Sequence, residues 1–257
     1  MSLKICTLNT WKCDGQYHDR LQLMAAETAR IKPDILMLQE AFAAGEDDTA
    51  ATLAAAMDGT VAAAPARDKE RDFGGRTVRS TSGLAFITTG EIVSSRAVSL
   101  PVPDADDNRI SQIAEIEIGG KRLLAVATHL THITEADSER QAEIEATLAA
   151  LPDLSGYDAA LFAGDFNCRP ETPPIRWLLE ESGVGAIDVC AAAGMEIVTR
   201  DTSSRYPPCR IDHIFLLDTG SPVAIDRVMR VYDTRDPTLG IFPSDHYGVM
   251  AELRLGN

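Results

Sequence analysis

Residues 159–167 read AALFAGDFN, and this stretch decides the fold class. Its first five residues are all apolar, which is typical of a strand covered on both faces. The run ends at Gly164, and the polar side chains of Asp165 and Asn167 follow directly. The stretch therefore predicts a buried strand that presents a carboxylate and an amide at its carboxyl end.

The same arrangement recurs at three other places in the chain. In each, a polar side chain suited to a metal ion or a phosphate follows an apolar run: Asn9 after residues 5–8, Glu40 after 35–38 and His129 after 123–128. Asp212 begins a predicted strand, while Asp245 and His246 precede another, as antiparallel strands entering from the same rim would show. Because strand ends on one rim lie close in space, we expect these side chains to converge.

The rest of the pattern predicts many strands and few helices. Strands are expected at 4–8, 35–38, 84–88, 92–100, 110–118, 122–128, 159–163, 211–216, 223–231 and 247–255, and helices at 19–31, 43–58, 136–151 and 172–183. Gly119-Gly120 predicts a hairpin turn. Residues 65–82, rich in Arg, Asp, Gly, Ser and Thr, are expected to form a long exposed loop.

This order favours an α/β fold in which two mixed sheets pack face to face with helices on the outside. The alternative is a doubly wound parallel sheet, which requires a helix between nearly every pair of strands. No repeat or linker divides the sequence, so we expect a single domain over residues 1–257.

The composition is that of an ordinary globular protein, with 45% hydrophobic and 25% charged residues. No apolar run approaches the roughly 18 residues of a membrane-spanning helix, and the first residues enter a strand pattern at once. We therefore expect neither a signal peptide nor a stable membrane association. The five cysteines show no CxxC spacing and are expected to be reduced thiols of a cytoplasmic protein.

The net charge of −15 repels nucleic acid at long range, because non-specific binding relies on Lys and Arg to neutralise phosphates. The net charge therefore argues against a DNA or RNA substrate without excluding one. The sequence also has no GxSxG, no HExxH, no phosphate loop ending in Gly-Lys-Ser/Thr and no GxGxxG. Hydrolysis through a covalent serine or at a zinc–thiolate site is therefore disfavoured.

Six short motifs resemble, in their order along the chain, those of the endonuclease/exonuclease/phosphatase (DNase I-like) family of metal-dependent phosphoesterases. They are TLNTW (7–11), LQE (38–40), THL (128–130), GDFN (164–167), RIDHIF (210–215) and SDH (244–246). The resemblance implies a four-layered α/β sandwich with its site at one end of two packed sheets. It also implies a Mg²⁺ or Mn²⁺ ion and in-line attack of water on a phosphorus centre, which makes the chain a phosphodiesterase or phosphatase.

The resemblance assigns the metal ion to Glu40, supported by Asn9 and Asp245, because hard dications prefer carboxylate and amide oxygens. Taken singly, Glu40 also fits a solvated carboxylate at a strand end. Asn9 also fits a turn in which its side chain bonds its own backbone.

The resemblance also assigns the catalytic groups. His246 acts as general base or orients the phosphate, and Asp212 fixes its tautomer. Asp165 positions or deprotonates the attacking water, Asn167 bonds a phosphate oxygen, and His129 donates to the phosphate. The pair of Asp212 and His246 also fits a buried structural contact.

Substrate choice is expected to depend on the loops 65–82, 103–109 and 201–210. The last offers Arg205 and Arg210 as substrate-binding residues, and the first offers several more basic side chains. No basic helix with interleaved aromatics is present, so a small or single-stranded phosphodiester or a phosphorylated metabolite is favoured over duplex DNA. The alternatives are a nuclease on DNA or RNA, a sphingomyelinase-like lipid phosphodiesterase, and a non-catalytic binding module.

Overall fold

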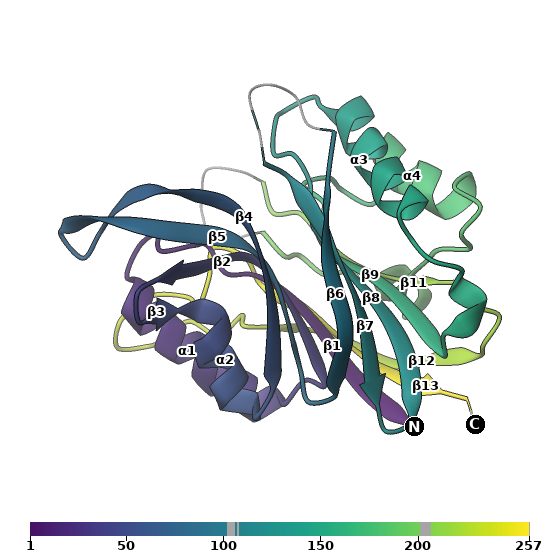
Figure 1. The fold of residues 1–257 in the computed structure, drawn as a ribbon, viewed down its shortest axis with the longest axis horizontal. Coiled ribbons are helices and arrows are strands. Elements are labelled where there is room, and N and C mark those ends of the chain that lie inside the picture. Colours follow the sequence, from purple (N-terminus) through teal and green to yellow (C-terminus); the bar gives the residue numbers. More distant parts are fainter. Residues whose placement is uncertain (102–105, 107, 201–206, 257) are drawn as a thin grey trace.

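The strands of the computed structural model form two sheets that pack face to face (Figure 1). The structure describes residues 1–257 except 102–105, 107, 201–206 and 257. In that part of the chain, the strand order of the first sheet is β12-β13-β1-β2-β5-β4, with β3 on β2, and that of the second is β10-β11-β9-β8-β7-β6. Both sheets are mixed, because β1 runs parallel to β2 and β8 runs parallel to β9.

The first sheet contains β1 (Ser2–Asn9), β2 (Ile35–Ala44), β3 (Asp47–Asp48), β4 (Thr60–Phe73), β5 (Arg76–Thr88), β12 (Val223–Val231) and β13 (Gly248–Leu255). The second contains β6 (Glu91–Ser99), β7 (Ile110–Ile118), β8 (Lys121–His129), β9 (Ala159–Asp165), β10 (Ile187–Asp188) and β11 (Asp212–Leu217). The helices are α1 (Tyr17–Ile31), α2 (Thr49–Met57), α3 (Asp137–Ala149), α4 (Pro173–Glu180) and α5 (Val189–Ala192), with a 3₁₀ turn, η2 (Leu154–Gly156).

Alternate residues of the central strands enter different cores, which explains their continuous apolar runs. Leu161 of β9 packs in the core between the sheets, while its neighbour Phe162 packs against the α3–α4 side. In β2, Met37 lies between the sheets and Leu38 packs under α1 and α2. Figure 1 shows these two helix pairs on opposite outer sides of the sheets. The predicted sandwich of two mixed sheets flanked by helices is confirmed.

The prediction of a long loop at residues 65–82 is wrong. These residues belong to the antiparallel hairpin of β4 and β5, which pair from Thr60 and Thr88 to a turn at Gly74-Gly75. The hairpin extends beyond the body of the first sheet in Figure 1. A projecting ribbon buries few side chains and therefore has the polar composition of a loop, although its backbone is paired.

The other predicted elements differ from the structure at their ends, and the short elements β3, η2, β10 and α5 were not predicted. The first helix begins at Tyr17, and the helix expected at 43–58 is preceded by the end of β2 and starts at Thr49. The hairpin turn at Gly119-Gly120 is confirmed, because both residues have the positive φ that a type I′ turn requires.

Gly164 explains why the GDFN motif begins with glycine. Its φ is +142°, and a Cβ at this position would lie 2.0 Å from the carbonyl oxygen of Thr128 on β8. We expect Gly164→Ala to destabilise the protein by on the order of 1–3 kcal/mol, because the two strands must separate. Denaturant unfolding measures this, with Gly156→Ala as control, since the nearest atom to its Cβ would be 4.0 Å away. Equal stability of the two variants would contradict the close approach of β8 and β9.

Candidate active site

The parallel strand pairs bring the predicted site residues to one rim of the sandwich. Asn9 at the end of β1 is paired with Gln39 within β2, and His129 is paired with Asp165 at the ends of β8 and β9. Asp212 begins β11 directly opposite Asp165, because β11 runs antiparallel to β9. The convergence of strand ends expected from the sequence is therefore seen in the backbone register.

Asp165 lies at the centre of the site and joins the two sheets. Its Oδ2 accepts a 3.1 Å hydrogen bond from Asn9 Nδ2, and its Oδ1 accepts one of 2.9 Å from the backbone of Asn167. The Nε2 atoms of His129 and His246 lie 3.5 and 3.9 Å from Asp165 Oδ2. Burial raises the pKa of Asp165, and the negative charge of Asp212 raises it further.

Asp212 and His246 form a buried pair beside Asp165. Asp212 Oδ2 lies 2.9 Å from His246 Nδ1, which leaves Nε2 directed at Asp165. Burial alone would lower the pKa of His246, but the charges of Asp212 and Asp165 raise it to about 10. The second carboxylate oxygen of Asp212 is buried with no hydrogen-bond partner among the described residues.

His129 and Asn167 complete the group around Asp165. Burial lowers the pKa of His129 well below 6.5, and the positive charge of Arg109 adds to the effect. A neutral imidazole donates from one ring nitrogen only. Asn167 has a left-handed backbone (φ 51°) and donates from Nδ2 to the carbonyl of Leu130 at 3.0 Å.

A second set of acidic residues adjoins Asp165. Burial raises the pKa of Asp245, and the charges of Glu40 and Asp165 raise it further, although His246 opposes them. These carboxylates repel one another, so a cation placed among them would be stabilised. Lys12 already supplies one positive charge, with Nζ 3.2 Å from Glu40 Oε1.

A bulge in β2 directs Glu40 towards this rim. The pairing of β2 with β5 shifts between Leu38 and Ala41, and Glu40 has a φ of 57°, which is rare for a residue with a Cβ. Glu40 was expected to follow the end of its strand, but β2 continues to Ala44, and the bulge re-aims the Glu40 side chain from within the strand.

Arg20 organises the loops that carry the site, a role that was not predicted from the sequence. It is 1% exposed and donates to the carbonyls of Thr10, Trp11, Lys12, Asp14 and Pro243. Its guanidinium thus links the segment after Asn9 to the segment before Asp245. Its position within a predicted helix gave no sign of this, because all the acceptors are backbone atoms.

Ser244, the first residue of the SDH motif, fixes the same junction. Its hydroxyl donates to the carbonyl of Asn9 at 2.6 Å and accepts from the backbone of His246 at 3.3 Å. The motif therefore contains a positioning serine as well as two predicted site residues.

One of the two predicted substrate-binding arginines, Arg210, is paired with a carboxylate. Arg210 is held by Asp188, with its two terminal nitrogens 2.8 and 2.5 Å from the carboxylate oxygens, and its side chain is 9% exposed. Asp188 thus occupies the guanidinium of Arg210, and a substrate contact of Arg210 stays a prediction. Arg205 lies outside the described residues.

The other histidines lie apart from this centre. His213 is fully buried, and its Nε2 lies 3.0 Å from the carbonyl oxygen of Cys168. His18 is exposed and lies 2.8 Å from Asp47. His132 contacts Asp106 at 3.0 Å.

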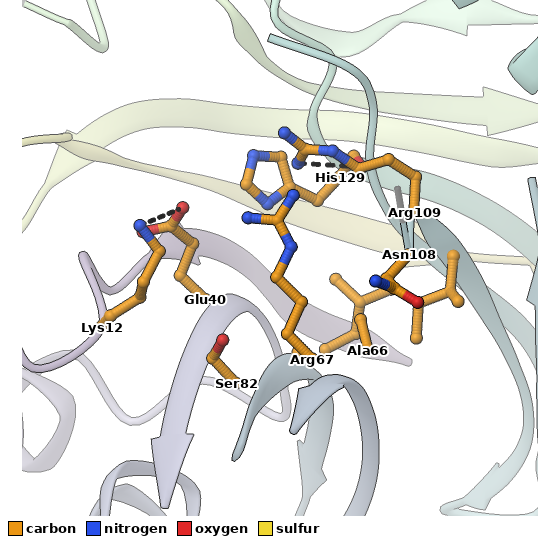
Figure 2. Close-up of a pocket in the computed structure, with 11 residues that line it drawn as sticks. Lys12, Glu40, Ala66, Arg67, Ser82, Asn108, Arg109 and His129 are labelled. Carbon is orange, nitrogen blue, oxygen red and sulfur yellow. Dashed lines mark hydrogen bonds and ion pairs between the residues drawn. The ribbon is translucent and has the colours of Figure 1, made fainter. Parts of the chain in front are cut away.

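Two hollows adjoin the site. Figure 2 shows the first, which is basic and is lined by Lys12, Glu40, Arg67, Asn108, Arg109 and His129. The second has a volume of about 760 Å³ and is lined in part by Trp11, Arg235, Ile241, Phe242 and Asp245. One hollow thus shares Glu40 and His129 with the candidate site, and the other shares Asp245.

Two mixed sheets covered by helices, with carboxylate, amide and imidazole groups at one rim, define a DNase I-like hydrolase of phosphate esters. Residues 6–246 match the model of the endonuclease/exonuclease/phosphatase family, and the chain belongs to this family. The resemblance found in the six motifs is thereby confirmed. Members of this family are hydrolases that act on phosphoester bonds and are generally dependent on a divalent metal.

Solved structures share the fold at low sequence identity. An endonuclease/exonuclease/phosphatase from Bacteroides vulgatus has a TM-score of 0.76 and 19% identity, and the match covers 100% of both chains. The human Nocturnin catalytic domain with bound sulfate anion has a TM-score of 0.76 and 17% identity, covering 99% of this chain and 94% of that one. D. rerio TDP2 complexed with single strand DNA product has a TM-score of 0.70 and 20% identity, covering 98% of this chain and 99% of that one. No curated protein matches the sequence.

Among the described residues, none of the helices has both the length and the apolar character needed to cross a membrane.

Proposed function

We propose that this protein uses Mg²⁺ or Mn²⁺ to hydrolyse a small or single-stranded phosphodiester, by in-line attack of water. The observation that carries the proposal is the buried group of Asp165, Asp212 and His246, in which His246 Nδ1 lies 2.9 Å from Asp212 and Nε2 lies 3.9 Å from Asp165. The cluster lies beside the oxygen-bearing residues Asn9 and Glu40, which belong to the other sheet.

Asn9, Glu40 and Asp245 would hold the ion. Their side chains offer the oxygen ligands that hard dications prefer, and the mutual repulsion of the carboxylates favours a cation there. Asp165, Asp212 and His246 also have the spacing of a metal site. We assign them to catalysis instead, because Asp212 and His246 are already bonded to each other. When bound, the ion would neutralise charge on the phosphate oxygens.

Asp165 would position the attacking water and accept its proton. Its carboxylate is held by Asn9 from one sheet and by the backbone of Asn167 from the other, so its orientation is fixed before substrate binds. Preorganised groups of this kind lower the barrier because they need not reorient during the reaction.

The two histidines and Asn167 would orient the phosphate. His246 is fixed through Nδ1 by Asp212, so Nε2 is the atom available to a phosphate oxygen. His129 lies on the other side of Asp165 and offers a second ring nitrogen. Donors on both sides of one carboxylate suit a tetrahedral phosphate placed over the attacking water.

The second hollow supports a substrate with an organic group on the phosphate. Trp11 and Phe242 offer aromatic faces for a planar or apolar substituent, next to the predicted metal ligand Asp245. A nucleobase fits this description, so a nuclease on single strands is the second candidate. The D. rerio TDP2 complex with a single strand DNA product, which shares this fold, supports that candidate. We also propose a cytoplasmic location, because all five cysteines are free thiols.

A substrate panel in the presence and absence of metal tests the proposal. We expect Mg²⁺- or Mn²⁺-dependent turnover of at least one of an aryl phosphodiester, an aryl phosphomonoester, short RNA, plasmid DNA and sphingomyelin. The single-stranded and small diesters should be the better substrates, and turnover should disappear in excess chelator. Full turnover in chelator, after removal of tightly bound metal, would contradict the metal-dependent mechanism.

A further inference from the structure

Lys12 is a charged residue of the candidate active site that the proposed mechanism does not use. Its Nζ lies 3.2 Å from Glu40 Oε1 and 3.9 Å from Asp14 Oδ2, and its side chain is 28% exposed. Lys12, Glu40 and His129 line the same hollow. Figure 2 shows the amine directed at the Glu40 carboxylate. The lysine thus places a positive charge next to a predicted metal ligand, at a surface that a ligand can reach.

The backbone at Lys12 has a conformation that residues with a side chain rarely adopt. The φ angles of Trp11 and Lys12 are 56° and 41°. Asn9 Oδ1 accepts a 3.0 Å hydrogen bond from the backbone nitrogen of Trp11. Arg20 donates to the carbonyls of Trp11 and Lys12, both at 3.1 Å. Such residues persist only where the surrounding structure imposes the conformation, so the lysine backbone is fixed before any ligand binds.

The amine of Lys12 can donate to more than one oxygen. A lysine ammonium carries three N–H groups. In the part of the chain that the structure describes, its ion-pair partners are Glu40 and Asp14. Glu40 Oε1 is within hydrogen-bonding distance, whereas Asp14 Oδ2 is beyond it. One carboxylate oxygen does not engage three N–H groups, so the exposed amine can bind a further oxygen.

The neighbouring histidine does not supply a positive charge. Burial lowers the pKa of His129 well below 6.5, and nearby positive charges, that of Lys12 among them, lower it further. The imidazole is therefore neutral at neutral pH. His246 is balanced by Asp212, whose Oδ2 lies 2.9 Å from its Nδ1. Negative charge on a phosphate undergoing hydrolysis is stabilised by cations fixed beside it, and Lys12 is such a cation next to Glu40.

We propose that Lys12 binds a non-bridging oxygen of the phosphate that is hydrolysed, while its amine stays next to Glu40. This inference rests on the proposed function, in which Glu40 holds the metal ion. Lysine binds phosphate as a point charge and needs no fixed direction of approach. The amine then has two opposite effects, because it competes with a cation for Glu40 and attracts the phosphate. Its removal should strengthen binding of the ion and weaken binding of the phosphate.

Calorimetric titration of the Lys12→Met variant measures both effects. We expect a higher Mn²⁺ affinity than in the wild type. The affinity for inorganic phosphate in saturating Mg²⁺ should be about 10- to 100-fold lower, since a hydrogen bond to a charged group contributes this much. Lys12→Arg keeps the charge and the donors and should retain most of the phosphate binding. Lys69→Met removes an exposed lysine of β4 and is the matched control, which should bind both ligands like the wild type.

Steady-state kinetics on the best substrate of the panel give a second measurement. At saturating Mg²⁺, kcat/KM of Lys12→Met should be about 10- to 100-fold below the wild-type value. Lys69→Met should match the wild type. Because the metal is saturating, weaker binding of the ion cannot cause the loss. Melting temperatures of the variants identify any loss of folding.

Two results would overturn the phosphate contact while leaving the proposed function intact. One is wild-type phosphate affinity in a folded Lys12→Met variant, because the amine would then only compete with the ion. The other is an unchanged kcat/KM in the same variant. Loss of phosphate binding in Lys12→Met, in a protein that turns over no substrate, would support the contact and contradict the proposed function. Absence of phosphate binding to the wild-type protein would contradict the contact.

Discussion

Replacement of His246 by alanine is expected to lower kcat by roughly 10²- to 10⁴-fold, the usual contribution of a positioned acid or base. The imidazole is buried, its Nδ1 lies 2.9 Å from Asp212 Oδ2, and its Nε2 faces Asp165. Substrate affinity should change less than kcat, because the hydrogen bond to phosphate strengthens as charge develops in the transition state. Steady-state kinetics with saturating metal provide the measurement.

The double variant Asp212→Asn with His246→Ala should cost little more in kcat than His246→Ala alone. Residues that act as one unit are not additive, and Asp212 has no proposed role apart from orienting the imidazole. If the losses of kcat in the two single variants added fully in the double variant, Asp212 would act on the reaction independently of His246. Loss of stability without loss of kcat in the folded fraction of His246→Ala would instead make the pair a structural contact.

The stability of the metal-free protein should reflect the same pair through its pH dependence. The pKa of His246 is raised from 6.5 to about 10, so the folded state binds the proton more tightly than the unfolded state. The stabilisation of the folded state by this proton is complete below about pH 6.5 and is lost as the pH rises towards 10. The His246→Ala variant should lack this component of the pH dependence.

Replacement of Glu40 by glutamine is expected to abolish most of the activity and to weaken Mn²⁺ binding by about 100-fold or more. Residues that only support a metal ligand already contribute about 10- to 100-fold, and a direct ligand should contribute no less. Calorimetric titration with Mn²⁺ measures the affinity apart from turnover. Glu91→Gln, at an exposed carboxylate that begins β6, is the matched control and should bind Mn²⁺ like the wild type.

The Lys12→Met substitution is expected to have the opposite effect on Mn²⁺ affinity to Glu40→Gln. Lys12 Nζ lies 3.2 Å from Glu40 Oε1 and competes with an added cation for that oxygen. Removal of the amine should therefore strengthen Mn²⁺ binding.

Wild-type Mn²⁺ affinity in the Glu40→Gln variant would show that the ion binds elsewhere. The cluster of Asp165, Asp212 and His246 would then be the alternative metal site.

The pattern of residues along the chain was enough to predict the layers of the fold and the rim that carries the site. A run such as residues 159–163 can be apolar at every position only where both faces of a strand are covered, and β9 does lie between two cores. The residues that end such runs are fixed in place by the backbone, so Asn9, His129 and Asp165 converge without further information. The extent of a single domain over residues 1–257 stays a prediction.

Which charged residues face a ligand depends on tertiary contacts that the sequence does not reveal. Arg210 lies close to Asp212 in sequence, yet Asp188 occupies its guanidinium. Arg67 of β4 and Arg109, which precedes β7, both bind Asp106. Long polar side chains carry no periodic signal, and their partners depend on distances between elements far apart in the chain. The same limit applies to the β4–β5 hairpin, because a projecting ribbon and a loop share a polar composition and differ only in their backbone pairing.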